Sequence, residues 1–230
     1  MEIVPAILTK SYEDLKNKIS LVKGFIPMVQ VDICDGKFVT STTWPFLGSN
    51  VLEKHFLAIL DEREGMPFWE EIDFELDLMV NDAIENFDIY SKLSPKRMIF
   101  HIEAFENINT LSEFLEGLDP YLKDIIEFGV AKNPKTDMAK LEKVLPFVSF
   151  VQLMGIDNIG RQGEEFQNSI LEDIKYLKNK YQGIKISVDG GVDENNAYDL
   201  SEAGVDILVS GSAIYNSEDV LGKIEYFKNL

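Results

Sequence analysis

The sequence predicts a closed (β/α)8 barrel, and two observations carry that prediction. The first is that eight alternating strand and helix signals fit into 230 residues, as an eightfold barrel requires. The second is that several strands are continuous apolar runs, which is typical of a parallel sheet covered by helices. A doubly wound open sheet is the rival fold, but no G-x-G-x-x-G motif follows the first strand. No linker or low-complexity stretch interrupts the pattern, so we expect one barrel domain over residues 1–230.

The predicted strands are short apolar stretches that run into polar or glycine-containing turns. Polar residues two positions apart at a strand end project from the same face of the strand, so both can point into the barrel. We expect strands at residues 3–8, 28–33, 73–80, 97–103, 125–131, 148–154, 185–189 and 205–210.

The predicted helices follow the strands one by one. Ser11 is a candidate N-cap for the first helix, with Asp14 three residues further on. A looser region through Trp44, Pro45 and Gly48 precedes the second helix. We expect helices at about residues 12–25, 51–62, 82–93, 110–122, 140–145, 169–180, 194–203 and 220–230.

The charge balance restricts the partners. With 40 acidic and 22 basic residues the formal net charge is −18, a surface that repels nucleic acid and anionic membranes. We therefore expect neither as a partner. Solubility alone also explains such acidity, and a phosphorylated ligand would need a local site that overcomes the repulsion.

The chain carries no feature of a secreted or membrane protein. No stretch reaches the roughly 18 apolar residues that a membrane helix needs. The first residues contain no basic region before an apolar one, so we expect no secretory signal. Cys34 is the single cysteine, which excludes an intramolecular disulfide and suits a reducing cytoplasm. We expect a cytoplasmic protein.

Two aspartates stand where buried strands run into glycine turns. Asp32 lies near the end of the second predicted strand, from which the chain runs on to Gly36, and Asp189 ends the seventh. In a barrel of this kind the C-terminal strand ends form the active face, so the two carboxylates can face one site and transfer a proton. For either aspartate alone, a cap or a loop-fixing hydrogen bond is the simpler explanation.

Other polar side chains are expected at the same face. Together with the two aspartates they would place several carboxylates close to one another. Such proximity raises the pKa values of the carboxylates unless a cation or hydrogen bonds compensate. The other candidates at these strand ends are Gln30, Glu75, Asp77, His101, Glu103, Gln152 and Met154.

Glycines follow the last two strands. Gly190 and Gly191 come directly after Asp189, and Gly211 and Ser212 follow the eighth strand. The loops after strands seven and eight are the usual phosphate site of such barrels, and glycine lets backbone amides approach an anion closely. Tight turns without a ligand remain the alternative explanation.

Seven motifs, spread over nearly the whole chain and in the same order, resemble the ribulose-phosphate 3-epimerase family. They are residues 5–8 (P-A-I-L against P-S-I-L), 31–39 (V-D-I-C-D-G-K-F-V against H-x-D-x-M-D-G-H-F-V), 76–80 (L-D-L-M-V against V-H-L-M-V), 100–104 (F-H-I-E-A against F-H-x-E-A), 133–136 (N-P-K-T against N-P-x-T), 188–192 (V-D-G-G-V against V-D-G-G-I) and 209–214 (V-S-G-S-A-I, ending like G-S-A-I/V).

The resemblance implies a barrel of the ribulose-phosphate binding type and a 3-epimerase that interconverts ribulose 5-phosphate and xylulose 5-phosphate, or a similar ketose phosphate. Asp32 and Asp189 match the two residues that exchange the C3 proton. The resemblance also implies a homo-oligomer, because the family often forms dimers or hexamers. Residues that match substrate or phosphate positions are Met79, Met154, Gly160, Gly190, Gly191, Gly211 and Ser212.

The departures from the family pattern gather at its metal site. The family usually holds a divalent ion with two histidines and the two aspartates, but here Gln30 and Asp77 replace the histidines. His101 matches a position that is not a family ligand. Ala6 replaces a serine that touches the substrate, and the loop of residues 157–163 differs from the family's N-P-G-F-G-G-Q.

Three accounts of these departures stay open. In the first, Gln30, Asp32, Asp77 and Asp189 hold Mg²⁺ or Mn²⁺ rather than Zn²⁺, because all four offer oxygen. In the second no metal binds, and Lys37 or Arg161 stabilises the enediolate. In the third the chain has lost epimerase activity, and it binds a phosphosugar without turnover or acts as a related isomerase or lyase.

Overall fold

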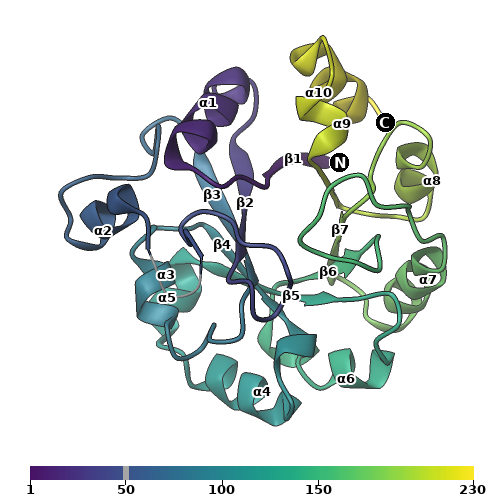
Figure 1. Ribbon diagram of the computed structural model, residues 1–230. Helices are drawn as coiled ribbons and strands as arrows, with labels where there is room; N and C mark the ends of the chain where they lie inside the picture. Colours follow the sequence, from purple (N-terminus) through teal and green to yellow (C-terminus); the bar gives the residue numbers. More distant parts are fainter. Residues whose placement is uncertain (49–51) are drawn as a thin grey trace.

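The computed structural model describes residues 1–48 and 52–230 and confirms the predicted barrel. Eight parallel strands pair in sequence order, and the eighth pairs with the first to close the sheet. Figure 1 shows the helices as a ring around these strands. The strands are β1 (Glu2–Ile7), β2 (Met28–Cys34), β3 (Asp73–Met79), β4 (Arg97–His101), β5 (Glu127–Lys132), β6 (Phe150–Met154), β7 (Lys185–Asp189) and β8 (Ile207–Ser210).

The helices depart from the sequence expectation more than the strands do. Pro120, at the first position of its helix, divides the helix expected at residues 110–122 into two. The helix expected at residues 82–93 is confined to Phe87–Ser91. The helix expected at residues 51–62 is observed at Lys54–Leu60, and residue 51 itself lies outside the described residues. The α-helices are α1 (Tyr12–Val22), α2 (Lys54–Leu60), α3 (Phe87–Ser91), α4 (Ile108–Gly117), α5 (Pro120–Ile125), α6 (Met138–Glu142), α7 (Ile170–Lys180), α8 (Ala197–Glu202), α9 (Ser212–Tyr215) and α10 (Val220–Lys228), and the 3-10 helices are η1 (Ile102–Ala104) and η2 (Leu145–Phe147).

The first helix begins where the sequence indicates. The Ser11 side chain accepts a hydrogen bond from the backbone amide of Asp14, which satisfies one of the free N–H groups of the first turn of α1. The helix then buries Leu15, Ile19 and Val22 against the barrel. Its apolar spacing therefore matches the helical period.

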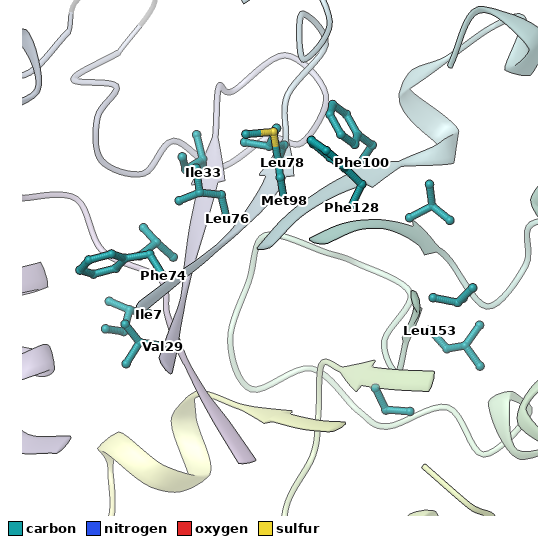
Figure 2. Close-up of a cluster of buried hydrophobic side chains, with 14 of the residues drawn as sticks. Ile7, Val29, Ile33, Phe74, Leu76, Leu78, Met98, Phe100, Phe128 and Leu153 are labelled. Atoms are coloured by element: carbon teal, nitrogen blue, oxygen red, sulfur yellow. The ribbon is translucent and has the colours of Figure 1, made fainter. Parts of the chain in front are cut away.

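Side chains alternate along each strand between the helices and the barrel interior. Figure 2 shows part of the outer layer, in which Val29, Leu76 and Phe100 belong to the large buried cluster between strands and helices. The neighbours of these residues along each strand point into the barrel, because successive side chains of a strand leave opposite faces. Gln30, Asp77 and His101 are therefore inside the barrel, and all three are fully buried.

A buried ionic cluster fills the N-terminal half of the barrel. Arg97 on β4 contacts Glu75 on β3 at 3.4 Å and Glu2 on β1 at 2.8 Å. Burial raises the pKa of Glu75 to about 8, although the charge of Arg97 opposes the rise. These residues close the interior opposite the glycine turns, at the face where a barrel of this class places stability rather than catalysis.

Among the described residues, no helix combines the length and apolar character needed to cross a membrane.

Candidate active site

Strand register brings the polar strand ends together. Asp32 on β2 is paired with Asp77 on β3, and Met154 on β6 is paired with Asp189 on β7. One oxygen from each of Asp32, Asp77 and Asp189 lies within 4.8 Å of the others. The three predicted carboxylates therefore form one cluster inside the C-terminal mouth of the barrel.

The Gln30 side chain joins the two aspartates that the family motifs single out. Its Nε2 donates to Asp32 Oδ1 at 2.8 Å and to Asp189 Oδ2 at 3.0 Å. Its Oε1 is buried and has no hydrogen-bond partner. A metal site made of oxygen donors alone would need this amide oxygen to face the carboxylates, whereas in this structure the amide nitrogen faces them and links them.

Asp77 is bonded by two other side chains, those of His101 and Gln152. His101 Nε2 donates to Asp77 Oδ1 at 2.8 Å, and Gln152 Nε2 donates to Asp77 Oδ2 at 3.3 Å. Burial lowers the pKa of His101, but the neighbouring carboxylates, Asp77 foremost among them, raise it overall. The Phe38 ring centroid lies 5.5 Å from that of the His101 ring.

The environment favours the protonated forms of both linked aspartates. Burial, followed by the charges of Asp189 and Asp77, raises the pKa of Asp32 well above its ordinary range. Burial and the charge of Asp77 raise the pKa of Asp189 to about 7. The Gln30 hydrogen bonds oppose both shifts because they stabilise the ionised carboxylates. Near neutral pH the pair can therefore hold one acid and one base.

A pocket opens above Asp32 and Asp189, which are each about 8% exposed. Asp77 and Gln30 lie beneath it, fully buried. Ala6 lines the wall where the family has a serine. The predicted substrate or phosphate residues that line the pocket are Met79, Met154, Gly160, Gly190, Gly191, Gly211 and Ser212.

Gly190 shows why glycine is needed at this mouth. Its φ of +97° lies in the left-handed region, and a Cβ there would lie 2.7 Å from Ile156 Cγ1. The chain can therefore turn sharply after Asp189 and leave its backbone at the pocket surface.

Sulfur-containing side chains form an apolar wall beside the carboxylates. Cys34 Sγ lies 3.9 Å from Met79 Sδ, and both pack in a buried cluster with Met154. Burial, followed by the charges of Asp32 and Asp77, raises the pKa of the Cys34 thiol. Cys34 therefore contributes packing rather than a thiolate to this site.

The two cations expected near the site are placed differently. Arg161 lines the pocket, and its Nη2 donates to Thr40 Oγ1 at 3.0 Å. Lys37 is exposed and does not line the pocket; its backbone amide donates to Asp35 Oδ1 at 2.8 Å. Arg161 is the cation that the structure brings to the site.

The donor set fits a hard divalent cation. Asp32, Asp77 and Asp189 offer carboxylate oxygens in one cluster, and hard cations prefer oxygen ligands. The unpartnered Oε1 of Gln30 would add a fourth oxygen if the amide turned over. Among the described residues, the histidine beside this cluster is His101, whose Nε2 meets Asp77 as a hydrogen-bond partner.

Fold and site together define a (β/α)8 barrel with a cluster of buried carboxylates at its C-terminal mouth. The model of the "Ribulose-phosphate 3 epimerase family" matches residues 2–215. The curated ribulose-phosphate 3-epimerase of Helicobacter pylori is 28% identical, covering 100% of this chain and 98% of the relative. That of Bacillus subtilis is 26% identical, with 95% and 94% covered. The chain therefore belongs to the ribulose-phosphate 3-epimerase family, an isomerase family of carbohydrate metabolism whose members generally use a divalent metal.

Solved structures support the fold. KGPDC from Streptococcus mutans, in complex with D-R5P, superposes with a TM-score of 0.71 at 15% identity, covering 99% of this chain and 95% of that one. A 3-hexulose-6-phosphate synthase superposes with a TM-score of 0.68 at 16% identity, with 100% and 99% covered. The barrel is thus shared with enzymes of phosphosugar chemistry.

Sequence reasoning missed part of the centre. His101 was noted at its strand end, but its bond to Asp77 depends on the register between β3 and β4. Thr43 was not singled out, although its hydroxyl donates to the backbone oxygen of Asp32 at 2.6 Å and so fixes the end of β2. No local motif marks either contact; the inward parity of His101 was the one available signal.

Proposed function

We propose that the chain is a 3-epimerase that interconverts ribulose 5-phosphate and xylulose 5-phosphate, or a similar ketose phosphate. The observation that carries this proposal is the link through Gln30, which holds Asp32 and Asp189 together at the floor of one pocket. Family membership and the glycine turns beside Asp189 support it.

In the proposed reaction one aspartate removes the proton at C3 and the other returns a proton to the opposite face, which inverts that carbon. In one direction Asp189, with its pKa near 7, takes the C3 proton onto a carboxylate oxygen. The electron pair moves toward the adjacent carbonyl and gives an enediolate. Asp32, whose pKa is also raised well above its ordinary range, then donates its proton to C3. In the reverse direction the two roles exchange.

The surrounding residues would support these two transfers. Met79 and Met154 line the pocket with apolar surface, which keeps water away from the enediolate. Amides of the turns at Gly190, Gly191 and Gly211 would hold the phosphate. The carboxylates of Asp32, Asp77 and Asp189 would hold a divalent cation while Gln30 keeps its link to two of them, with Mg²⁺ or Mn²⁺ favoured over Zn²⁺ by the oxygen donors. Such a cation supplies positive charge that stabilises the enediolate oxygen.

The proposal is tested by incubating the protein with ribulose 5-phosphate and measuring xylulose 5-phosphate. Mg²⁺, Mn²⁺, Zn²⁺ and Fe²⁺ are each added to metal-stripped protein, and a fifth sample stays metal-free. We expect epimerisation, fastest with Mn²⁺ or Mg²⁺, and its loss in Asp32→Asn. A protein that binds the sugar phosphate but gives no product under any condition would be a binding protein instead.

A further inference from the structure

A second cavity opens at the end of the barrel opposite the carboxylate cluster. It is lined by Asp73, the first residue of β3, and by Lys96, which precedes β4, whereas Asp77 and Met79 belong to the other end of β3. Its volume of about 500 Å³ lies within the usual range for a small-molecule site. We call it the basal cavity.

Apolar side chains from three segments form the floor of the basal cavity. Ile59 belongs to α2, Ile72 and Phe74 lie at the start of β3, and Leu93 follows α3. Each of these four side chains is at most 4% exposed, because each also packs into the large buried cluster. A flat apolar ring that enters the cavity would therefore meet apolar surface and displace no polar group.

Trp69 forms an exposed aromatic wall of this cavity. Of the two tryptophans in the chain, Trp44 is fully buried whereas Trp69 is 62% exposed. The indole of Trp69 lies against the backbone of Gly65, where a Cβ would lie 2.6 Å from Trp69 Cδ1. Tryptophan is on average a highly buried residue with a large apolar surface, so an exposed indole beside a cavity is typical of a binding surface.

The backbone around the basal cavity adopts costly conformations. Glu62, Phe68 and Ser94 have φ of +59°, +60° and +54°, and they are the non-glycine residues with positive φ in the described part of the chain. Glu62 and Ser94 line the cavity, and Phe68 directly precedes Trp69. Side chains are costly to hold in the left-handed region, and such residues gather at functional sites. The cost is therefore concentrated in the segments that shape this one cavity.

Two lysines supply positive charge at the rim. Lys92 and Lys96 are both exposed and line the cavity. The Nζ of Lys92 donates to the backbone oxygen of Leu60 at 3.0 Å, which holds its ammonium group at the rim. Within residues 1–48 and 52–230 neither lysine forms an ion pair. Both charges can therefore face an anionic ligand.

The same rim carries carboxylates. Glu64 is paired with His55 at 2.7 Å, whereas Glu62 and Asp73 are exposed and form no ion pair with another described residue. Carboxylates accept hydrogen bonds from hydroxyl groups, and the two hydroxyls of a ribose are commonly bound in this way. The ligand that suits this rim combines an anionic group for the lysines with hydroxyl donors for the carboxylates.

We propose that the basal cavity binds a nucleotide, with its base stacked on Trp69 and its phosphate at Lys92 and Lys96. An exposed aromatic ring stacks with any nucleobase, and lysine binds phosphate as a point charge. The ribose hydroxyls would donate to Glu62 or Asp73. The inference does not depend on the proposed function, because the cavity and the carboxylate cluster lie at opposite ends of the barrel.

The test titrates adenosine 5′-monophosphate, adenosine and ribose 5-phosphate separately into the full chain. Calorimetry measures affinity, and quenching of the exposed indole of Trp69 reports where the ligand binds. The variants are Trp69→Leu, Lys92→Met and Lys96→Met. Tyr198→Leu and Lys16→Met are the matched controls, because both residues are exposed and neither lines the basal cavity.

We expect adenosine monophosphate to bind and to quench the indole emission. Trp69→Leu should weaken the binding of adenosine monophosphate and of adenosine by about fivefold to a hundredfold, the range for one base stacked on an aromatic ring. Lys92→Met and Lys96→Met should each weaken the monophosphate by up to about fivefold, less so at high salt, and leave adenosine unchanged. Ribose 5-phosphate should not change the emission, since it has no base to stack.

Three results would overturn the inference. The first is that adenosine monophosphate gives neither heat nor quenching at millimolar concentrations. The second is that Trp69→Leu, folded by circular dichroism, binds it as tightly as Tyr198→Leu. The third is that ribulose 5-phosphate displaces it, which would place the nucleotide in the carboxylate pocket. A chain that binds the nucleotide at Trp69 but does not epimerise would support this inference and contradict the proposed function alone.

Discussion

Asp77 and His101 form a fully buried pair in a chain whose family has a histidine at the first of these positions. Burying a lone carboxylate is costly, and a hydrogen-bonded partner of opposite charge compensates for it. The pair thereby allows a third carboxylate to lie beside Asp32 and Asp189. At this scale, the protein itself supplies the hydrogen bond that compensates for the burial of the Asp77 carboxylate.

We predict that breaking the Asp77–His101 pair destabilises the fold. His101→Ala leaves the Asp77 carboxylate buried without its partner, so the free energy of unfolding should fall by about 3–5 kcal/mol. Urea denaturation of metal-stripped protein measures it. Asp77→Asn with His101→Ala should lose less than the sum of the two single changes, and additive losses would show that the residues do not interact.

We also predict that Gln30→Met slows the reaction without weakening substrate binding. Methionine matches the size of glutamine but cannot donate to Asp32 and Asp189, so kcat should fall by about tenfold to a hundredfold with KM nearly unchanged. Gln152→Met is the comparison, because its longer 3.3 Å bond reaches Asp77 rather than the proton-transferring pair. Steady-state kinetics distinguishes them, and an equal effect of both would contradict the assigned role of Gln30.

At the scale of elements, the site depends on turns that leave strand ends abruptly. β7 ends with Asp189 at the mouth of the barrel, and Gly190 and Gly191 follow with φ of +97° and +68°. The turn after β8 lies next to Gln162, in the loop between β6 and α7. The glycine positions therefore shape the pocket as much as the strands do.

We predict that Gly190→Ala impairs substrate binding more than a matched change elsewhere. Gly183 has φ of +92° but no atom within 4 Å of a Cβ, whereas a Cβ at Gly190 meets Ile156 at 2.7 Å. Both changes should cost about 1 kcal/mol or more of stability through backbone strain. Gly190→Ala should in addition raise KM by about tenfold. If KM stayed at the parent value in both variants, the turn after β7 would not bind substrate.

At the scale of the whole molecule, buried acids make stability depend on pH. The pKa of Asp189 is raised from 3.8 to about 7 and that of Glu75 from 4.5 to about 8. The folded state thus binds more protons than the unfolded chain between about pH 4 and pH 8. Their stabilising effect is complete below the unfolded pKa values and is lost as pH rises through the folded ones.

We therefore predict that metal-stripped protein is more stable near pH 5 than near pH 8. Each such group contributes a slope of about 1.4 kcal/mol per pH unit within its window. Asp189→Asn should flatten the curve up to about pH 7, and Glu75→Gln should flatten it to slightly higher pH. Urea titrations across this range provide the measurement, and stability that rises with pH would refute the prediction.

Much of the fold could be predicted from the sequence, because the spacing of apolar residues and the turn residues at strand ends are local signals. The eight strands and the N-cap at Ser11 follow from apolar runs and capping chemistry. The limits of α3 did not, because apolar and polar residues are mixed over the whole of residues 82–93, whereas only Phe87–Ser91 form the helix. Among the candidate site residues, Asp32 and Asp189 could be found because each lies at or near the end of a strand that leads into a glycine turn.

The rest of the site depends on contacts between distant segments. The Asp77–His101 bond requires the β3–β4 register, and the Arg161–Thr40 bond joins residues 121 positions apart. The orientation of the Gln30 amide follows from two carboxylates on different strands. No sequence pattern encodes such tertiary contacts locally.

The most direct test of the account is exchange of the C3 proton with deuterated water in single-aspartate variants. Asp32→Asn and Asp189→Asn are each incubated with ribulose 5-phosphate and separately with xylulose 5-phosphate, and deuterium at C3 is followed by NMR. Two aspartates on opposite faces predict that both variants lose epimerisation and that each still exchanges one ketose, a different one in each variant. Exchange of the same ketose by both variants, or continued epimerisation by either, would contradict proton transfer by Asp32 and Asp189.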